Sequence, residues 1–228
     1  MHIPIGPAAK LIQKIYAWLQ SVLGVGFNKY PMYVRSDEHF FTQPLLEELV
    51  FFLNASFEAG YKAYDIHHLR SLLNKCPGLY LCVIDRVILS SKPNAPKIIG
   101  AYKLIPLGVS ATKKAIAGNL EVIDILPDDI EENLHHAAGI WIGDLCVASP
   151  FQCPHSALGR HLMEQIKSHV RDFHAKKPIF CRTERKDIQE LLIRRGFVPV
   201  LNEEGEINGK TIWMLPSEAQ MRKMQRIV

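Results

Sequence analysis

The stretch "GDLCVASPFQCPHSALGRHLM", residues 143–163, decides how this chain folds. Together with the "GIWI" before it, its first part is a nearly continuous apolar run, which is typical of a strand buried in a sheet. Its last part opens a segment in which Leu158, Leu162, Ile166 and Val170 fall on one stripe of a helix. The proline and histidine residues between the two parts predict a turn. The sequence therefore places a strand-to-helix corner here.

The segments on both sides of this corner predict a mixed α/β chain with antiparallel hairpins around a strand, helix, strand, helix, strand unit. Residues 107–139 are harder to assign and are interpreted as an insertion, with a short helix at 110–118, a strand at 120–126 and an acidic, turn-rich end. The remaining predicted strands cover 29–36, 79–85, 97–106, 139–149, 178–183 and two strands within 198–215. The remaining predicted helices cover 42–60, 64–75, 156–177 and 184–197, and a basic helix is predicted at the C-terminal end after 215.

Composition indicates a globular protein. Hydrophobic residues make up 48% of the 228 residues and charged residues 22%, which argues against both a disordered chain and a membrane channel. The net charge is only +4, and the basic residues are scattered among acidic ones rather than gathered in a stripe. We therefore expect no nucleic-acid partner, and the ligand has to be inferred from a site.

The five cysteines are odd in number, and Cys82, Cys146 and Cys181 lie inside apolar runs where a thiol behaves as a small buried hydrophobe. This usage predicts a reducing, cytoplasmic setting. No pair has CxxC spacing, and the histidine pairs at 67–68 and 135–136 lack the spacing that places two ligands on one helix face. We therefore expect no metal site.

Residues 1–28 are predicted to form an amphipathic helix appended to a single domain at 29–228. Leu11, Ile15 and Trp18 share one face, while Lys10 and Lys14 interrupt the apolar stretch and argue against a signal peptide. We expect this face to pack on the domain or on a second subunit, as in a homodimer. Attachment to a membrane surface is the less favoured alternative.

The corner and the segment after it carry a resemblance to a known family. The runs "DLCVASP" at 144–150 and "SALGRHLM" at 156–163, followed by "FCRTERKDIQELLIRRGF" at 180–197, resemble the GNAT superfamily of acyl-coenzyme A dependent N-acyltransferases. The resemblance spans roughly residues 30–215 and is most specific from 139 to 200. It implies an α/β (α+β) fold with a mixed, mostly antiparallel central sheet flanked by helices.

The resemblance also implies a cofactor site at the corner. A helix start has unpaired N–H groups and partial positive charge, so it suits the pyrophosphate of acetyl-CoA or another acyl-CoA. The strand is expected to splay from its neighbour after Asp144 and to pair with the pantetheine arm. The turn departs from the family pattern, being about two residues longer and keeping Gly159 as its glycine. The residues expected at the cofactor are Leu145, Cys146, Val147, His155, Ser156, Ala157, Leu158, Gly159 and Arg160.

Acyl transfer to an amine needs a group that takes a proton from the amine. Asp144 is the leading candidate for this base, and Glu121 and Asp124 are weaker ones. The alternative for Asp144 is that its carboxylate only bonds to the backbone or fixes the neighbouring loop.

The proton donor for the leaving thiolate is less clear from the sequence. Leu192 stands where many family members have a catalytic tyrosine. Tyr102, Cys153 or a water would then serve, or the thiolate would leave unassisted because its pKa is only about 8.5. Arg182 and Arg185 follow a strand where they reach either a substrate carboxylate, a coenzyme phosphate or a surface salt-bridge partner.

The function expected from the resemblance is transfer of an acyl group, most simply acetyl, from acyl-CoA to a small-molecule or peptide amine by direct attack in a ternary complex. Two alternatives remain open. One is a degenerate domain that binds CoA or a partner without catalysis, which the lost glycines and tyrosine suggest. The other is an acyltransferase that uses a longer acyl chain. The segments 40–64 and 107–139, which shape the acceptor pocket in such folds, match no interpretable motif.

Overall fold

A computed structural model of the chain describes residues 31–39, 41–56, 64–85, 97–121, 125–148, 157–201, 211–218 and 220. The predicted N-terminal helix at 1–28 lies outside these residues, and so does its predicted packing on the domain or on a second subunit. None of the described helices is both long and apolar enough to cross a membrane.

The described strands form one seven-stranded sheet in the order β1-β2-β3-β4-β5-β7-β6. Neighbouring strands are antiparallel except β4 and β5, which are parallel. This confirms the mixed, mostly antiparallel sheet and the two predicted hairpins, β2 with β3 and β6 with β7. The strands are β1 (Pro31–Arg35), β2 (Tyr80–Asp85), β3 (Ile98–Leu107), β4 (Gly139–Val147), β5 (Ile179–Arg182), β6 (Val198–Val200) and β7 (Ile212–Leu215).

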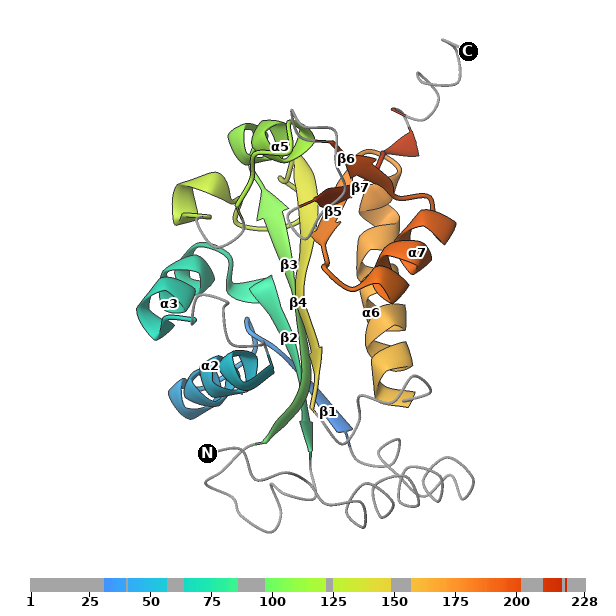
Figure 1. Ribbon diagram of the computed structural model, residues 1–228. Helices are drawn as coiled ribbons and strands as arrows, with labels where there is room; N and C mark the ends of the chain where they lie inside the picture. Colours follow the sequence, from blue (N-terminus) through green and yellow to red (C-terminus); the bar gives the residue numbers. More distant parts are fainter. Residues whose placement is uncertain are drawn as a thin grey trace, which may run out of the picture.

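Helices cover both faces of this sheet. Figure 1 shows α2 and α3 on one face and α6 and α7 on the other. The helices are α2 (Gln43–Ser56), α3 (Ile66–Lys75), α5 (Val109–Ile116), α6 (Ala157–His174) and α7 (Lys186–Arg194), with short 3-10 turns η2 (Pro77–Leu79) and η4 (Pro127–Asp129).

Every residue of strand β3 is buried, because the strand lies in the middle of the sheet between two covered faces. Ala101 and Ile105 belong to the apolar cluster beneath α2 and α3, whereas Tyr102 and Leu104 belong to the cluster beneath α6. Lys103 lies between Ala101 and Ile105 and is therefore directed toward the α2 and α3 face.

Helix α6 buries the predicted stripe of Leu158, Leu162, Ile166 and Val170 against the sheet. Its first turns lie close to β3 because Gly100 has no side chain there. A Cβ built at Gly100 would be 3.0 Å from Leu162 Cδ1 and 3.7 Å from Leu158 Cδ2. The close fit fixes the start of α6 beside the end of β4.

The predicted insertion contains one confirmed element and one that its described residues do not support. The short helix is present as α5, but the described residues 120–121 and 125–126 belong to no strand. Leu120 and Ile125 are nevertheless buried, so their apolar character reflects packing under a loop rather than strand pairing. Leu107 at the end of β3 instead forms an isolated bridge with Ile130.

Candidate active site

Strands β4 and β5 separate to form a fork. Their parallel ladder comprises Ile140 with Ile179 and Trp141 with Phe180, and beyond Trp141 no pair joins the described residues of β4 to β5. On its other side β4 stays paired with β3 as far as Val147. Figure 1 shows β4 continuing well past the end of β5. The predicted splay is present, but it begins before Asp144 rather than after it.

A bulge interrupts β4 within this fork. Lys103 pairs with Gly143 and Ala101 pairs with Cys146, so two residues, Asp144 and Leu145, oppose the single residue Tyr102. Asp144 has a φ of 51°, in the left-handed region that non-glycine residues seldom adopt. A bulge of this kind redirects a strand and leaves one residue outside the ladder, and such bulges are over-represented beside active sites.

The Asp144 side chain is enclosed by three partners. Lys103 Nζ lies 2.9 Å from Asp144 Oδ2, and the two side chains are only 5% and 6% exposed. The Tyr80 hydroxyl donates to Oδ2 and the Tyr64 hydroxyl donates to Oδ1. We call these four residues, Lys103, Asp144, Tyr64 and Tyr80, the bulge cluster. Burial first, and then the Asp144 charge, raises the pKa of both tyrosine hydroxyls well above the usual range.

The Lys103 side chain reaches Asp144 by crossing Gly143. A Cβ built at Gly143 would lie 2.9 Å from Lys103 Cε and 3.4 Å from Lys103 Cγ. The ammonium also lies 5.4 Å from the centre of the Tyr64 ring and 5.9 Å from that of Tyr80, within the range of cation–π attraction. The missing side chain at Gly143 is thus what lets a long cation lie along the strand and meet the carboxylate.

These contacts bear on the predicted role of Asp144. Both carboxylate oxygens already accept hydrogen bonds, and the side chain is almost fully buried. This arrangement matches the alternative in which the carboxylate fixes neighbouring structure. That Asp144 is the base stays a prediction.

The sequence patterns did not predict the three partners of Asp144. One signal for Lys103 was available, because a lysine inside an otherwise apolar strand is almost never fully buried without a partner. Tyr64 and Tyr80 gave no such signal, since aromatic residues are ordinary members of a core.

The predicted cofactor residues on β4 differ in exposure and in strand pairing. Leu145 is 43% exposed at the fork. Cys146 is buried, and its burial, followed by the Asp144 charge, raises the pKa of its thiol to about 12, so it is an uncharged, inert thiol. Val147 pairs with Gly100 of β3.

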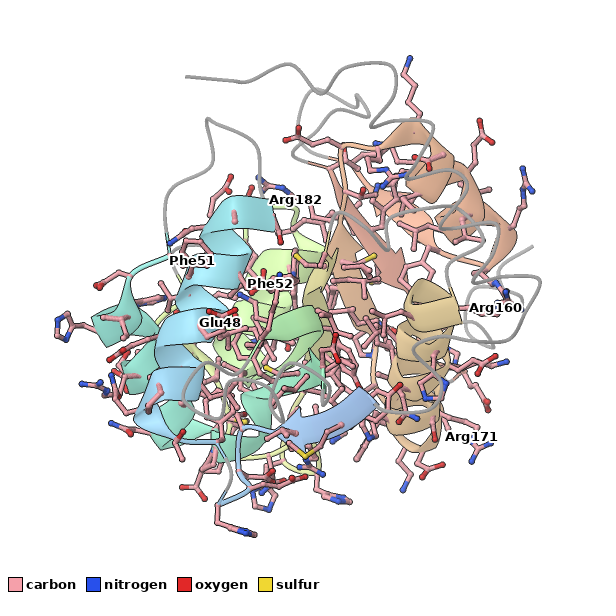
Figure 2. All side chains as sticks on the ribbon, turned by 90° about the horizontal axis from the view of Figure 1, so that it is seen from below. Glu48, Phe51, Phe52, Arg160, Arg171 and Arg182 are labelled. Carbon is pink, nitrogen blue, oxygen red and sulfur yellow. The ribbon has the colours of Figure 1, made fainter. Side chains whose placement is uncertain are left out.

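The predicted cofactor residues around the helix start are only partly described. His155 and Ser156 lie outside the described residues, and Ala157 begins α6. Leu158 is buried in the core, which gives its side chain a packing role. A Cβ built at Gly159 would meet no atom of the described residues within 4 Å. Figure 2 shows Arg160 on the outer side of α6, where it is exposed.

Among the described residues, the alternative acid Tyr102 does not lie beside Asp144. Tyr102 lies on the opposite face of the sheet, where its hydroxyl is hydrogen-bonded to His169 Nδ1 at 2.6 Å. Leu192 lies on α7, while Asp124 and Cys153 are outside the described residues.

Arg182, the last residue of β5, and Arg185, which follows the strand, both form salt bridges. Arg182 Nη1 lies 2.9 Å from Glu121 Oε2, and Arg185 Nη2 lies 2.6 Å from Asp187 Oδ2. Figure 2 shows Arg182 on the side of the sheet that α2 covers. Glu121, the weaker candidate base, is therefore engaged with a cation at the end of β5.

Comparison with known proteins finds similarity only in structure. No protein-family model matches the chain, and no curated protein matches it. Among solved structures, the chain is similar to one of the NatC complex bound to Gag peptide and CoA, with 17% identity and a TM-score of 0.47 over 82% of this chain and 98% of that one. It is also similar to the loading GNATL domain of CurA from Lyngbya majuscula (12% identity, TM-score 0.49, 71% and 68% covered). A GNAT family acetyltransferase from Brucella melitensis in complex with acetyl-CoA has 12% identity and a TM-score of 0.46, with 82% and 88% covered.

Proposed function

We propose that the protein is an acyl-CoA dependent N-acyltransferase, most simply an acetyltransferase, which acts on a small-molecule or peptide amine in the cytoplasm. The observation that carries the proposal is the fork between β4 and β5 with the bulge at Asp144 and Leu145 inside it. An open strand edge beside a bulge offers backbone groups to an extended ligand, as an added strand would. The sequence resemblance implies a splayed strand in the same region, after Asp144.

The residues present suit the coenzyme in two places. The edge of β4 from Leu145 to Val147 would pair with the pantetheine arm, and the start of α6 at Gly159 and Arg160 would face the phosphates. Gly159 has no side chain, so it presents no Cβ to a phosphate that approaches the backbone there. Acyl-CoA would supply the activated thioester, and the chain would supply binding and orientation.

The chemistry requires little more than orientation. The neutral amine attacks the thioester carbonyl carbon, the C–N bond forms, and the C–S bond breaks with its electron pair leaving on sulfur. The amine proton passes to a base, for which Asp144 remains the candidate, or to water. The thiolate is stable enough to leave without a protein acid, which is consistent with Leu192 at the tyrosine position.

The proposal is tested by measuring CoA release from acetyl-CoA in the presence of a panel of amines and peptides. Chromatography is the suitable readout, because it separates CoA from every thiol of the protein. We expect CoA to form only when an acceptor amine is added. If no amine gives CoA above the rate without protein, the enzyme proposal is wrong.

A matched pair of arginines on α6 tests the coenzyme site. Arg160 lies in the first turn and Arg171 near the other end, and Figure 2 shows both on the outer side of the helix. Arg160→Ala is expected to weaken CoA binding several-fold, as loss of one charge-assisted phosphate contact does, and Arg171→Ala is expected to leave it unchanged. Equal effects of the two variants would contradict a phosphate site at the helix start.

A second candidate function is binding of CoA or a partner without turnover. The enclosed Asp144 carboxylate favours it, because both of its oxygens are already occupied. This candidate predicts that CoA raises the melting temperature while no amine stimulates CoA release.

A further inference from the structure

Asp144 holds an unfavourable backbone conformation in the middle of the fork. Its φ of 51° lies in the left-handed region, which an alanine at the same place would occupy less readily than a glycine. The same residue begins the bulge that sets the path of β4 beyond the point where β5 separates. The contacts that fix Asp144 therefore also fix the edge of β4 that faces the fork.

We infer that the bulge cluster is a positioning device, in which Lys103, Tyr64 and Tyr80 fix the Asp144 carboxylate and thereby the bulged path of β4 against which the acyl group is aligned. Lys103 and the two tyrosines are positioning residues, because they act through Asp144. The inference rests on the proposed acyl transfer and assigns it residues that the sequence did not reveal.

The contacts of the Asp144 carboxylate support a role in which it acts by fixing the backbone of β4. Two hydroxyls and one ammonium converge on two oxygens, and the ion pair is nearly sealed from solvent. A carboxylate that took a proton from an amine would lose its charge and would leave a buried ammonium without its counter-charge. A carboxylate that only fixes the strand keeps its charge and all three hydrogen-bond donors.

Gly143 gives independent support. Its lack of a side chain opens the path along which the Lys103 stem runs to Asp144, and a methyl group there would meet Lys103 Cε at 2.9 Å. The lysine end can move, but only by withdrawing from the carboxylate. Gly143→Ala therefore perturbs the cluster without removing any charged group from the chain.

The decisive experiment compares Asp144→Gly with Asp144→Ala in acetyl transfer to an amine that the wild-type protein accepts. Neither variant has a carboxylate, but glycine adopts the left-handed backbone without strain. We expect kcat of D144G to exceed that of D144A by about tenfold, with the KM for acetyl-CoA within threefold. Calorimetric titration with CoA gives the fraction of each variant that binds the coenzyme. Dividing by this fraction corrects kcat for unfolded protein.

Two further variants complete the test. Lys103→Met and Gly143→Ala are expected to lower kcat while leaving the KM for acetyl-CoA nearly unchanged. The matched control is Lys114→Met, which removes a lysine paired with Asp129 at 3.5 Å on the exposed surface of α5, and it is expected to retain the wild-type kcat.

The outcomes separate this inference from the proposed function. Equal loss of kcat in D144G and D144A, in a chain whose wild type is active, would overturn positioning and assign the proton transfer to Asp144. A wild-type kcat in G143A and K103M would also overturn it. A wild-type protein that releases no CoA with any amine would instead overturn the proposed function itself, and the inference with it.

Discussion

Replacing Lys103 by methionine tests how strongly the bulge cluster contributes to folding. The ammonium and carboxylate are 2.9 Å apart with side chains 5% and 6% exposed, and at an effective dielectric constant near 20 their attraction is about 6 kcal/mol. Desolvation offsets much of that attraction in the intact pair. Removal of one partner leaves the other charge buried and unpaired, which typically costs about 3–5 kcal/mol. We expect K103M to lose about this much of its free energy of unfolding.

The double variant K103M/D144N should lose much less than the sum of the two single variants. Asparagine keeps the shape of the side chain, tolerates a positive φ and carries no charge, and methionine fills the space of the lysine stem. We expect a coupling energy of at least about 2 kcal/mol in this cycle, because each single change strands a charge that the double change removes.

Urea unfolding monitored by tryptophan fluorescence measures these energies, because Trp141 and Trp213 are both buried. The matched control is K114M, whose ion pair is 3.5 Å long with the lysine 53% exposed, and its loss is expected to stay below about 1 kcal/mol. If K103M costs less than about 1 kcal/mol, or if the two single losses simply add, the pair does not stabilise the bulge.

Three other variants give expectations that can be checked with the same assays. The pKa of the Cys146 thiol is raised to about 12 by burial and then by the Asp144 charge. The stability that this thiol contributes is therefore fully present below about pH 8.5 and declines by about 1.4 kcal/mol per pH unit above that pH. Cys146→Ala should reduce this decline in urea unfolding between pH 9 and 11. Burial, followed by the Arg35 charge, lowers the pKa of His169, so stability declines as the pH falls below about 6.5, and His169→Gln should flatten the curve between pH 5 and 6.5. Gly159→Ala should raise the free energy of unfolding by about 0.5–1 kcal/mol, because alanine favours a helix, yet raise the KM for acyl-CoA; an unchanged KM would argue against a phosphate beside this residue.

Most of the fold could be predicted from local patterns. The stripe of α6 and the apolar run of β4 each follow from a periodicity that a single segment carries, and both elements are found where they were expected. The strand predicted at 120–126 is not present in its described residues, where Leu120 and Ile125 are buried by packing on the core. A short apolar run does not reveal whether it is buried by strand pairing or by packing alone.

The candidate site could be predicted only in part. Asp144 was found because it stands in a motif, but the tyrosines that bind it precede it by 64 and 80 residues. Their meeting depends on the place of β2 within the sheet and on the packing of the residues before α3 against one face of it, which no local pattern expresses. The bulge was missed for a related reason, since it is a property of how β4 pairs with β3 and not of β4 alone.

The buried ion pair is better explained by its effect on the register of β4 than by a net contribution to the free energy of unfolding. An apolar residue at position 103 would suit its neighbours Ala101 and Ile105, and replacing a buried pair with apolar side chains is often neutral or stabilising. A straight β4 would, however, bring Cys146 opposite Gly100 instead of Ala101, and a slip of one residue turns every later side chain to the other face. The Lys103 and Asp144 pair forms only when the bulge is present, because only then does the carboxylate turn to the face where the ammonium lies. The pair thus favours the bulged register over the straight one, and with it the strand edge that the fork leaves open.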